Sequence, residues 1–174
     1  NDIKKNLSFL YNKNIIFLKS SKIEKKLAEY SFIKRLEIKK IYPNKLEIKI
    51  FEKEPIAIII DKEKKYYLGK KINLIEYKKI SKYNNLPIIY GDKKNFKILF
   101  DNLEQINFPI KLIKIFSFFE TKRWDLELTN NKIIKLPADN YKLSLKNFLE
   151  IKSNKNFDKY KVYDYRLEDQ LILK

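Results

Sequence analysis

The chain has 174 residues, of which 44% are hydrophobic and 14% aromatic, so it holds enough apolar side chains for the cores of one or two folded domains. It contains no cysteine and no histidine, which excludes disulfides, thiol nucleophiles, thiolate metal sites and histidine as a base or metal ligand. Its formal net charge of +17 favours an anionic partner or surface.

The distribution of the positive charge argues against specific recognition of nucleic acid. Only Arg35, Arg123 and Arg166 carry the guanidinium group that binds phosphate and guanine through two parallel hydrogen bonds. The lysines occur along the whole chain, interleaved with 22 acidic residues. We therefore expect loose attraction to anionic lipid surfaces in place of specific binding to nucleic acid, for which a steep salt dependence of DNA retention would be the sign.

The sequence contains neither a long apolar run nor a methionine. No run of about 18 apolar residues occurs, so neither a transmembrane helix nor a signal peptide is expected within these residues. The sequence also lacks methionine, and we expect it to be a fragment or a processed product of a longer protein.

The first third of the chain predicts two helices and a hairpin. Apolar residues at helical spacing indicate a short helix over residues 2–10, and Ser21 with Glu24 indicates a capping box at the start of a second helix. In residues 32–51, apolar side chains alternate with polar ones on both sides of Pro43, a residue typical of tight turns. These residues are therefore predicted to form an antiparallel hairpin.

The remainder of the chain predicts mostly strands, with two helices. The apolar run 56–60 is typical of a strand covered on both faces. Gly69 is expected to supply a positive φ in the turn between two short strands. A helix is predicted after residue 91, and another after Asn140, which is a candidate N-cap. The apolar face of the first of these helices comprises Phe96, Leu99, Phe100, Leu103 and Ile106.

A second hairpin is indicated around Asn131. Residues 124–128 alternate apolar and acidic side chains, and residues 134–136 return with apolar side chains at alternate positions. Asparagine adopts the left-handed conformation more readily than most residues, so it suits the turn between these strands.

Four stretches carry the motifs of a known family. Residues 42–55 read YPNKLEIKIFEKEP, residues 86–91 read LPIIYG, residues 121–137 read TKRWDLELTNNKIIKLP, and residues 162–171 read VYDYRLEDQL. In this order they resemble the end of the POTRA domain, the LPxxxG segment, the RWDLxLxxGxxIxLP hairpin and the closing strands of the bacterial cell division family FtsQ/DivIB. Tyr replaces the usual Trp of the first motif, and Asn replaces the Gly in the turn of the third.

The resemblance implies an α+β fold with two domains. Residues 1–54 correspond to an N-terminally incomplete POTRA domain of order α-α-β-β, in which the first strand of the family's domain is missing. Residues 55–174 correspond to the FtsQ-type β domain, a mainly antiparallel sheet with two flanking helices.

It also implies a function without catalysis. Proteins that this sequence resembles are held in the cell inner membrane by a single transmembrane helix, with the POTRA and β domains in the periplasm. At the division septum they act as scaffolds that link early and late division proteins by binding FtsB and FtsL. A membrane anchor of that kind would lie outside the present chain. The alternative function is that of a POTRA-type module that binds extended polypeptides in protein assembly or translocation.

Arg123 and Arg166 are candidates for binding a partner's carboxylates, because a planar guanidinium suits a carboxylate and the chain otherwise uses lysine. In the alternative interpretation, Arg123 only covers the apolar surface of Trp124 with its stem. The resemblance favours contact with an acidic C-terminal segment of FtsB. The predicted partner-binding residues are Arg123, Tyr165, Arg166, Leu167, Glu168, Asp169, Leu171 and Ile172.

Residues 167–173 are predicted to form a strand at the edge of the sheet. Such a strand presents unpaired N–H and C=O groups, which an extended segment of a partner can satisfy by pairing with it. The strand is therefore either an ordinary sheet edge or a docking edge.

No catalytic, metal or cofactor site is expected. Glu52 with Glu54 and Glu168 with Asp169 are carboxylate pairs, but in strands such neighbours lie on opposite faces or together on a solvated face. The sequence contains no glycine-rich phosphate loop and no Gly-x-Ser-x-Gly motif. We therefore predict a binding protein and not an enzyme.

Overall fold

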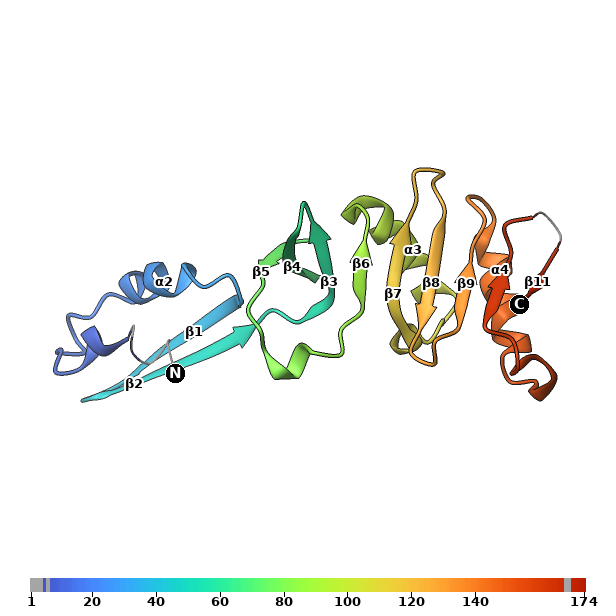
Figure 1. Ribbon diagram of the computed structural model, residues 1–174. Coiled ribbons are helices and arrows are strands. Elements are labelled where there is room, and N and C mark those ends of the chain that lie inside the picture. The colour runs from blue at the N-terminus through green and yellow to red at the C-terminus, as the bar shows by residue number, and fades with distance from the viewer. Residues whose placement is uncertain (1–4, 6, 168–169) are drawn as a thin grey trace. The chain divides into compact units, whose positions relative to one another are not determined.

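The structure is a computed structural model that describes residue 5 and residues 7–167 and 170–174 (Figure 1). The chain divides into two compact units, Asn1–Glu54 and Pro55–Lys174. Both units combine helices with strands, which confirms the predicted α+β class. Among the described residues, no helix is both long enough and apolar enough to cross a membrane.

The first unit consists mainly of one helix and one hairpin. Helix α2 (Ser20–Ala28) contacts strand β1 (Ile33–Ile41), which pairs antiparallel with β2 (Lys45–Glu52). Ile38 lies opposite Ile48 in this pairing, so the predicted hairpin is confirmed. The alternating apolar residues of both strands share one face, as the period of two in the sequence requires.

The start of this unit differs from the prediction. Residues 2–4 and 6 of the helix expected over residues 2–10 lie outside the described residues, and Ser8–Leu10 form a 3-10 helix in place of the predicted α-helix. Helix α2 begins two residues earlier than expected, with Lys19 at the N-cap and no side-chain cap hydrogen bond. The predicted capping box of Ser21 and Glu24 is therefore wrong, because Ser21 lies inside the first turn instead of preceding it.

The second unit is built on one sheet with the strand order β11-β10-β9-β8-β7-β6-β3-β4-β5 (Figure 1). The strands are β3 (Pro55–Asp61), β4 (Lys64–Gly69), β5 (Leu74–Glu76), β6 (Ile88–Tyr90), β7 (Ile113–Phe118), β8 (Trp124–Leu128), β9 (Ile133–Lys135), β10 (Val162–Asp164) and β11 (Ile172–Leu173). Neighbours are antiparallel except for β3 with β6, β6 with β7 and β9 with β10. The prediction of a mainly antiparallel sheet is confirmed.

Helix α3 (Lys93–Gln105) covers the middle of this sheet. Four of the five residues predicted for its apolar face are buried: Phe96, Leu99, Phe100 and Leu103. The fifth, Ile106, lies at the C-cap and is partly buried. The ring of Phe96 meets that of Phe116 on β7 edge to face, with centroids 5.2 Å apart, and burying one such ring stabilises the fold by about 1.5–3 kcal/mol. The helix begins at Asp92, whose carboxylate accepts hydrogen bonds from the N–H groups of Lys94 and Asn95.

Helix α4 (Tyr141–Ile151) covers the same face of the sheet nearer its C-terminal end (Figure 1). Phe148 packs edge to face against Tyr163 of β10, with ring centroids 5.0 Å apart. Asn140 occupies the N-cap position as expected, but its backbone is left-handed and its side chain makes no cap hydrogen bond. The two helices thus enclose one core on one face of the sheet. On the opposite face, Tyr83 of the 3-10 helix Ser81–Tyr83 packs against Tyr67 of β4, with ring centroids 5.5 Å apart.

Gly69 and Asn131 are both predicted to have a positive φ, and only Asn131 has one. Gly69 ends β4 without a positive φ, so the predicted role is wrong, and Ile72 takes the left-handed conformation with φ of 61°. A Cβ at this position would lie 2.6 Å from Oδ1 of Asn73, so a larger residue would require the Asn73 side chain to move. Asn131 has φ of 62° in the turn between β8 and β9, as predicted.

Candidate partner-binding site

A row of charged residues crosses strands β8, β9 and β10 on the face of the sheet opposite α3 and α4. Asp125 on β8 lies opposite Lys135 on β9, and Lys135 lies opposite Asp164 on β10. Trp124 and Leu126, the neighbours of Asp125, are buried in the core. Because side chains alternate between the two faces of a strand, the charged row faces away from the helices.

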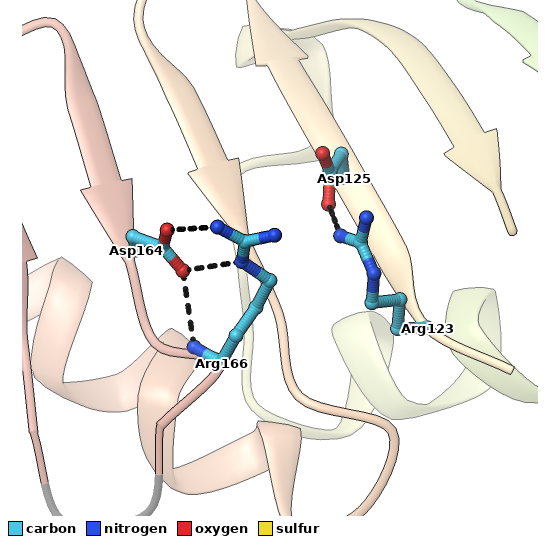
Figure 2. Close-up of polar contacts among 4 residues, drawn as sticks. All are labelled: Arg123, Asp125, Asp164 and Arg166. Carbon is cyan, nitrogen blue, oxygen red and sulfur yellow. Dashed lines mark hydrogen bonds and ion pairs between the residues drawn. The ribbon is translucent and has the colours of Figure 1, made fainter. Parts of the chain in front are cut away.

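Arg166 follows β10 and binds Asp164 through both carboxylate oxygens (Figure 2). Its Nε lies 2.8 Å from Oδ1 and its Nη2 lies 2.6 Å from Oδ2, while the backbone N–H of Arg166 donates to Oδ1 at 3.2 Å. These hydrogen bonds hold the pKa of Asp164 below its usual value although the carboxylate is only 5% exposed. The Arg166 side chain remains 41% exposed, and within the described residues its Nη1 has no hydrogen-bond partner.

Arg123 precedes β8 and makes a single contact with Asp125, at 2.6 Å between Nη1 and Oδ1 (Figure 2). The guanidinium also lies over the ring of Phe119, 4.2 Å from its centroid. Burial raises the pKa of Asp125, and the attraction of Arg123, Lys135 and Arg166 only partly offsets this effect. The guanidinium of Arg123 therefore covers the aromatic ring of Phe119.

The two arginines belong to one cluster. The charge of Arg166 lowers the pKa of Asp125, and Asp125 in turn raises the pKa of Arg166, although the Asp164 hydrogen bond is the larger cause of that rise. Both guanidinium groups lie on the same side of the strands in Figure 2. The structure thus brings together two arginines that are distant in the sequence, each already bound to an aspartate of the chain.

A groove of about 560 Å³ lies beside Arg166, between the start of α4 and the residues that follow β10. The residues that line it are Pro137, Ala138, Asp139, Asn140, Leu143, Ser144, Asn147, Tyr165, Arg166, Leu167, Gln170 and Leu171. Leu143 and Leu167 are 69% and 54% exposed. An apolar side chain could therefore enter this groove while a neighbouring carboxylate contacts Arg166.

Tyr165 forms part of the groove wall. It is buried, and its hydroxyl donates to Oδ1 of Asn147 on α4 at 2.9 Å. Burial raises the pKa of this hydroxyl above its usual value, so Tyr165 stays neutral at physiological pH. The hydrogen bond from Tyr165 to Asn147 connects the segment after β10 to α4 at the wall of the groove.

Strand β11 forms one edge of the sheet, but among the described residues of 167–173 it comprises only Ile172–Leu173, so the strand is shorter than predicted. Ile172 lies opposite Asp164 of β10, and the N–H of Lys174 donates to the carbonyl of Val162 at 3.1 Å. No strand among the described residues pairs with the other side of β11. Its outer edge is therefore open to pairing with an extended segment.

The structure places most of the predicted partner-binding residues in this region. Tyr165, Arg166, Leu167 and Leu171 line the groove. Glu168 and Asp169 lie outside the described residues. Ile172 lies on the edge strand, whereas Arg123 lies near Arg166 without lining the groove.

The sequence interpretation missed Asp125 and Asp164 as the partners of the two arginines, and Leu143 as part of the groove. In each ion pair Arg and Asp are two residues apart, and this spacing places side chains on one face of a strand. Leu143 lies off the buried face of α4 and was detectable as an apolar residue on the exposed side of a helix. Among the described residues, no group of three or more His, Cys, Asp or Glu could hold a metal ion.

Residues 57–166 match the family described as Cell division protein FtsQ/DivIB, C-terminal. This chain belongs to the FtsQ/DivIB family. Residues 1–53 match a second description, POTRA domain, FtsQ-type. The predicted resemblance is confirmed, and it connects the chain to bacterial cell division.

Curated relatives agree with this assignment. Cell division protein FtsQ of Rickettsia prowazekii (strain Madrid E) is 33% identical over 164 residues, which cover 87% of this chain and 58% of the relative. FtsQ of Rickettsia typhi (strain ATCC VR-144 / Wilmington) is 32% identical over 165 residues, covering 88% and 59%. The chain thus spans less than two thirds of the length of the FtsQ proteins that it matches.

A solved structure is also similar, the major extracytoplasmic domain of the trans isomer of DivIB from Geobacillus stearothermophilus. It shares 13% identity with this chain at a TM-score of 0.41 and covers 61% of this chain and 96% of that one. The family assignment rests on the sequence matches and not on this likeness.

Proposed function

We propose that this chain is the periplasmic part of a non-enzymatic divisome scaffold that binds FtsB and FtsL through its C-terminal strands. In this proposal residues 1–54 are the POTRA domain and residues 55–174 the β domain. The observation that carries the proposal is the combination of an open strand edge, a groove with exposed leucines and a half-exposed arginine in one place.

Each part of the site would recognise a different feature of the partner. The edge of β11 offers backbone hydrogen bonds to an extended segment. The groove beside Leu143 and Leu167 suits an apolar side chain, whose burial would supply affinity. Arg166 suits a carboxylate, because its Nη1 can donate without breaking the two bonds to Asp164. The expected FtsB segment is therefore acidic, partly apolar and extended.

Arg123 has a supporting role in this proposal. Its side chain is 20% exposed and lies against Phe119, so it has less freedom than Arg166 to bind a second carboxylate. Its charge still adds to the positive potential near Arg166 and attracts an acidic segment.

The location of the protein is part of the same proposal. FtsQ/DivIB membership supports a place at the division septum, with this region in the periplasm and a transmembrane helix in another part of the protein holding it to the inner membrane. The positive net charge would strengthen contact with anionic lipid at that membrane.

A second candidate function is the binding of many extended polypeptides, as in POTRA-type assembly modules. The open edge of β11 supports it, because backbone pairing alone does not select a sequence. The two functions differ in selectivity, since a scaffold prefers one acidic segment and a general peptide binder accepts many weakly.

The test is a calorimetric titration of the chain with the C-terminal periplasmic segment of FtsB from the same organism. Arg166→Ala is expected to weaken saturable binding by at least about tenfold. Arg35→Ala removes an equal charge from an exposed ion pair in the other unit and should leave the affinity unchanged. Circular dichroism would check that each variant is folded.

Leu167→Glu tests the groove without removing an arginine. The side chain is exposed, so the fold should tolerate the change, while a carboxylate at this position would repel an acidic segment. No binding by the folded chain would contradict the proposal, and equal affinity for a scrambled segment would favour the general peptide-binding function.

A further inference from the structure

We propose that the opposite edge of the sheet is a second docking site, which takes an extended acidic polypeptide segment as an added strand. We call this region the basic edge; it consists of strand β5 and its surroundings, residues 62–82. The proposal rests on the charge, the backbone and the apolar surface of this region, and it does not depend on the function of the β11 edge.

The basic edge has the chain's most concentrated positive charge. Residues 62–82 contain two glutamates and eight exposed lysines: Lys62, Lys64, Lys65, Lys70, Lys71, Lys78, Lys79 and Lys82. Only Lys70 forms an ion pair with another described residue, at 2.8 Å between its Nζ and Oε1 of Glu104. The region therefore attracts anions.

Among the strands of the described residues, only β4 pairs with β5. The strand lies at the end of the sheet and pairs with β4. The N–H of Gly69 donates to the carbonyl of Asn73, which makes these two residues a hydrogen-bonded pair. In an antiparallel ladder such pairs alternate with open ones, so the N–H and C=O groups of Leu74 and Glu76 point away from β4. They are available to a further strand.

The edge also exposes an apolar residue. Leu74 is 40% exposed and lies opposite Leu68, which is fully buried. An incoming strand with an apolar residue next to Leu74 would extend the core side of the sheet by one strand. Burying this surface would add to the backbone hydrogen bonds.

The position of the lysines makes the edge selective. None lies within β5 itself, whereas Lys71 precedes the strand and Lys78 and Lys79 follow it. Lysines around an edge repel a second copy of this basic chain, which protects the edge from self-association. The same lysines attract an acidic strand, so they exclude a second copy of this chain and select an acidic partner.

A polypeptide fits the basic edge better than a lipid surface or a nucleic acid. Lipid headgroups and phosphates would use the lysine charges but would leave the outward N–H and C=O groups of Leu74 and Glu76 without a strand partner. The region also lacks arginine, the residue that binds phosphate through two bonds.

The basic edge is independent of the β11 edge. The two lie at opposite ends of the strand order, and at a strand spacing of about 4.8 Å they are roughly 40 Å apart. A segment bound at one edge leaves the other free, so the sheet can connect two partners.

The probe is a short synthetic peptide of alternating aspartate and valine, labelled for fluorescence anisotropy. A control peptide has the same charge but carries prolines at alternate positions, which prevents strand pairing. The first peptide should bind at least about tenfold more tightly, and it should slow hydrogen exchange in residues 74–80. Protection in residues 170–174 in place of residues 74–80 would overturn the proposal.

Two substitutions at one position test the backbone contact. Glu76→Pro removes an outward N–H without removing a bond to β4, and Glu76→Ala makes the same change of charge while keeping the N–H. The proline variant should bind the probe peptide about fivefold more weakly than the alanine variant. Equal affinities would show that the peptide does not pair with β5.

A set of charge reversals tests selectivity. The variant with Lys71→Glu, Lys78→Glu and Lys79→Glu should bind the probe about tenfold more weakly. The matched control changes three exposed lysines elsewhere in the same unit: Lys94→Glu, Lys146→Glu and Lys155→Glu. Equal loss in both sets would show that only net charge matters and would overturn the proposal. Binding of anionic vesicles or DNA that outcompetes the peptide would overturn it in favour of a general anion surface.

Discussion

The two arginine–aspartate pairs of the candidate site have the same spacing in the sequence and opposite consequences. Arg166 holds Asp164 through two side-chain hydrogen bonds and one backbone hydrogen bond, and the pKa of Asp164 falls. Arg123 holds Asp125 through a single contact, and the pKa of Asp125 rises because burial outweighs the attraction. The number and direction of the hydrogen bonds decide whether a buried carboxylate is stabilised.

The same difference distinguishes the two arginines as binding residues. Arg166 is fixed in direction by a buried aspartate yet remains half-exposed, so it is already oriented for a carboxylate from outside. Arg123 lies against Phe119 and is mostly covered. A prediction that treats both as equal partner contacts overlooks this distinction.

The largest expected effect concerns the removal of each aspartate. Asp164→Ala should lower the free energy of unfolding by about 2 kcal/mol, since it removes three hydrogen bonds and Arg166 is only half-exposed. Asp125→Ala should change it by less than about 1 kcal/mol, because the cost of burying the carboxylate disappears with the contact. Urea unfolding of both variants measures the difference, and equal losses would contradict the comparison.

Next in size is the effect of replacing each arginine by lysine. Arg166→Lys should weaken binding of the FtsB segment by about tenfold, because lysine cannot hold Asp164 through two bonds and also donate to a partner. Arg123→Lys keeps the charge near the site and should change the affinity by less than about threefold. The same calorimetric titration measures both, and a greater loss with Arg123→Lys would reverse their assigned roles.

The pH dependence of stability should have opposite signs at the two aspartates. The folded-state pKa of Asp164 is lowered, so its contribution is complete above the unfolded-state value of about 3.9 and is lost as the pH falls through the folded-state value. The folded-state pKa of Asp125 is raised, so its unfavourable contribution at neutral pH is relieved as the pH falls. Asp164→Asn should therefore make the loss of stability in acid shallower, and Asp125→Asn should make it steeper. Thermal unfolding between neutral pH and pH 3 is the measurement, and parallel profiles would contradict this assignment.

The smallest expected effect is that of Lys135, which lies between both aspartates. Its charge lowers the pKa of Asp125 and of Asp164 without a hydrogen bond to either. Lys135→Ala should therefore raise both pKa values slightly and reduce stability by about 0.5 kcal/mol or less. Titration of the carboxyl carbons by NMR measures the shifts, and a pKa change at Asp125 alone would show that Asp164 is insulated by Arg166.

Much of the fold was predictable from local patterns. The alternation around Trp124 and the helical spacing around Phe96 are direct consequences of burying one face, and both predictions hold. The prediction is wrong at Gly69, where the glycine indicates a positive φ, and at Ser21, where the spacing to Glu24 indicates a helix N-cap. Gly69 lies close to the Asn73 side chain, and a contact of this kind does not appear in a turn pattern.

The site was predictable only in part. The motif match identified Arg166 and the residues around it, and the structure places Leu167 and Leu171 with it in one groove. The charged row was not foreseen, since it depends on the register of β8, β9 and β10. The parallel pairing of β9 with β10 depends on α4 crossing over the sheet, and no local pattern in either strand specifies that register.

The short strand β6 has a mechanical consequence for the whole sheet. It is three residues long and supplies all the ladder hydrogen bonds between β3–β4–β5 on one side and β7 to β11 on the other. Tension that separates the two outer edges would act across the strands, so it would load the bonds of β6 one after another in peeling and not all together in shear. The packing of α3 on both halves then becomes the main resistance to such a pull. This helix would then set how much force the sheet can transmit between its edges.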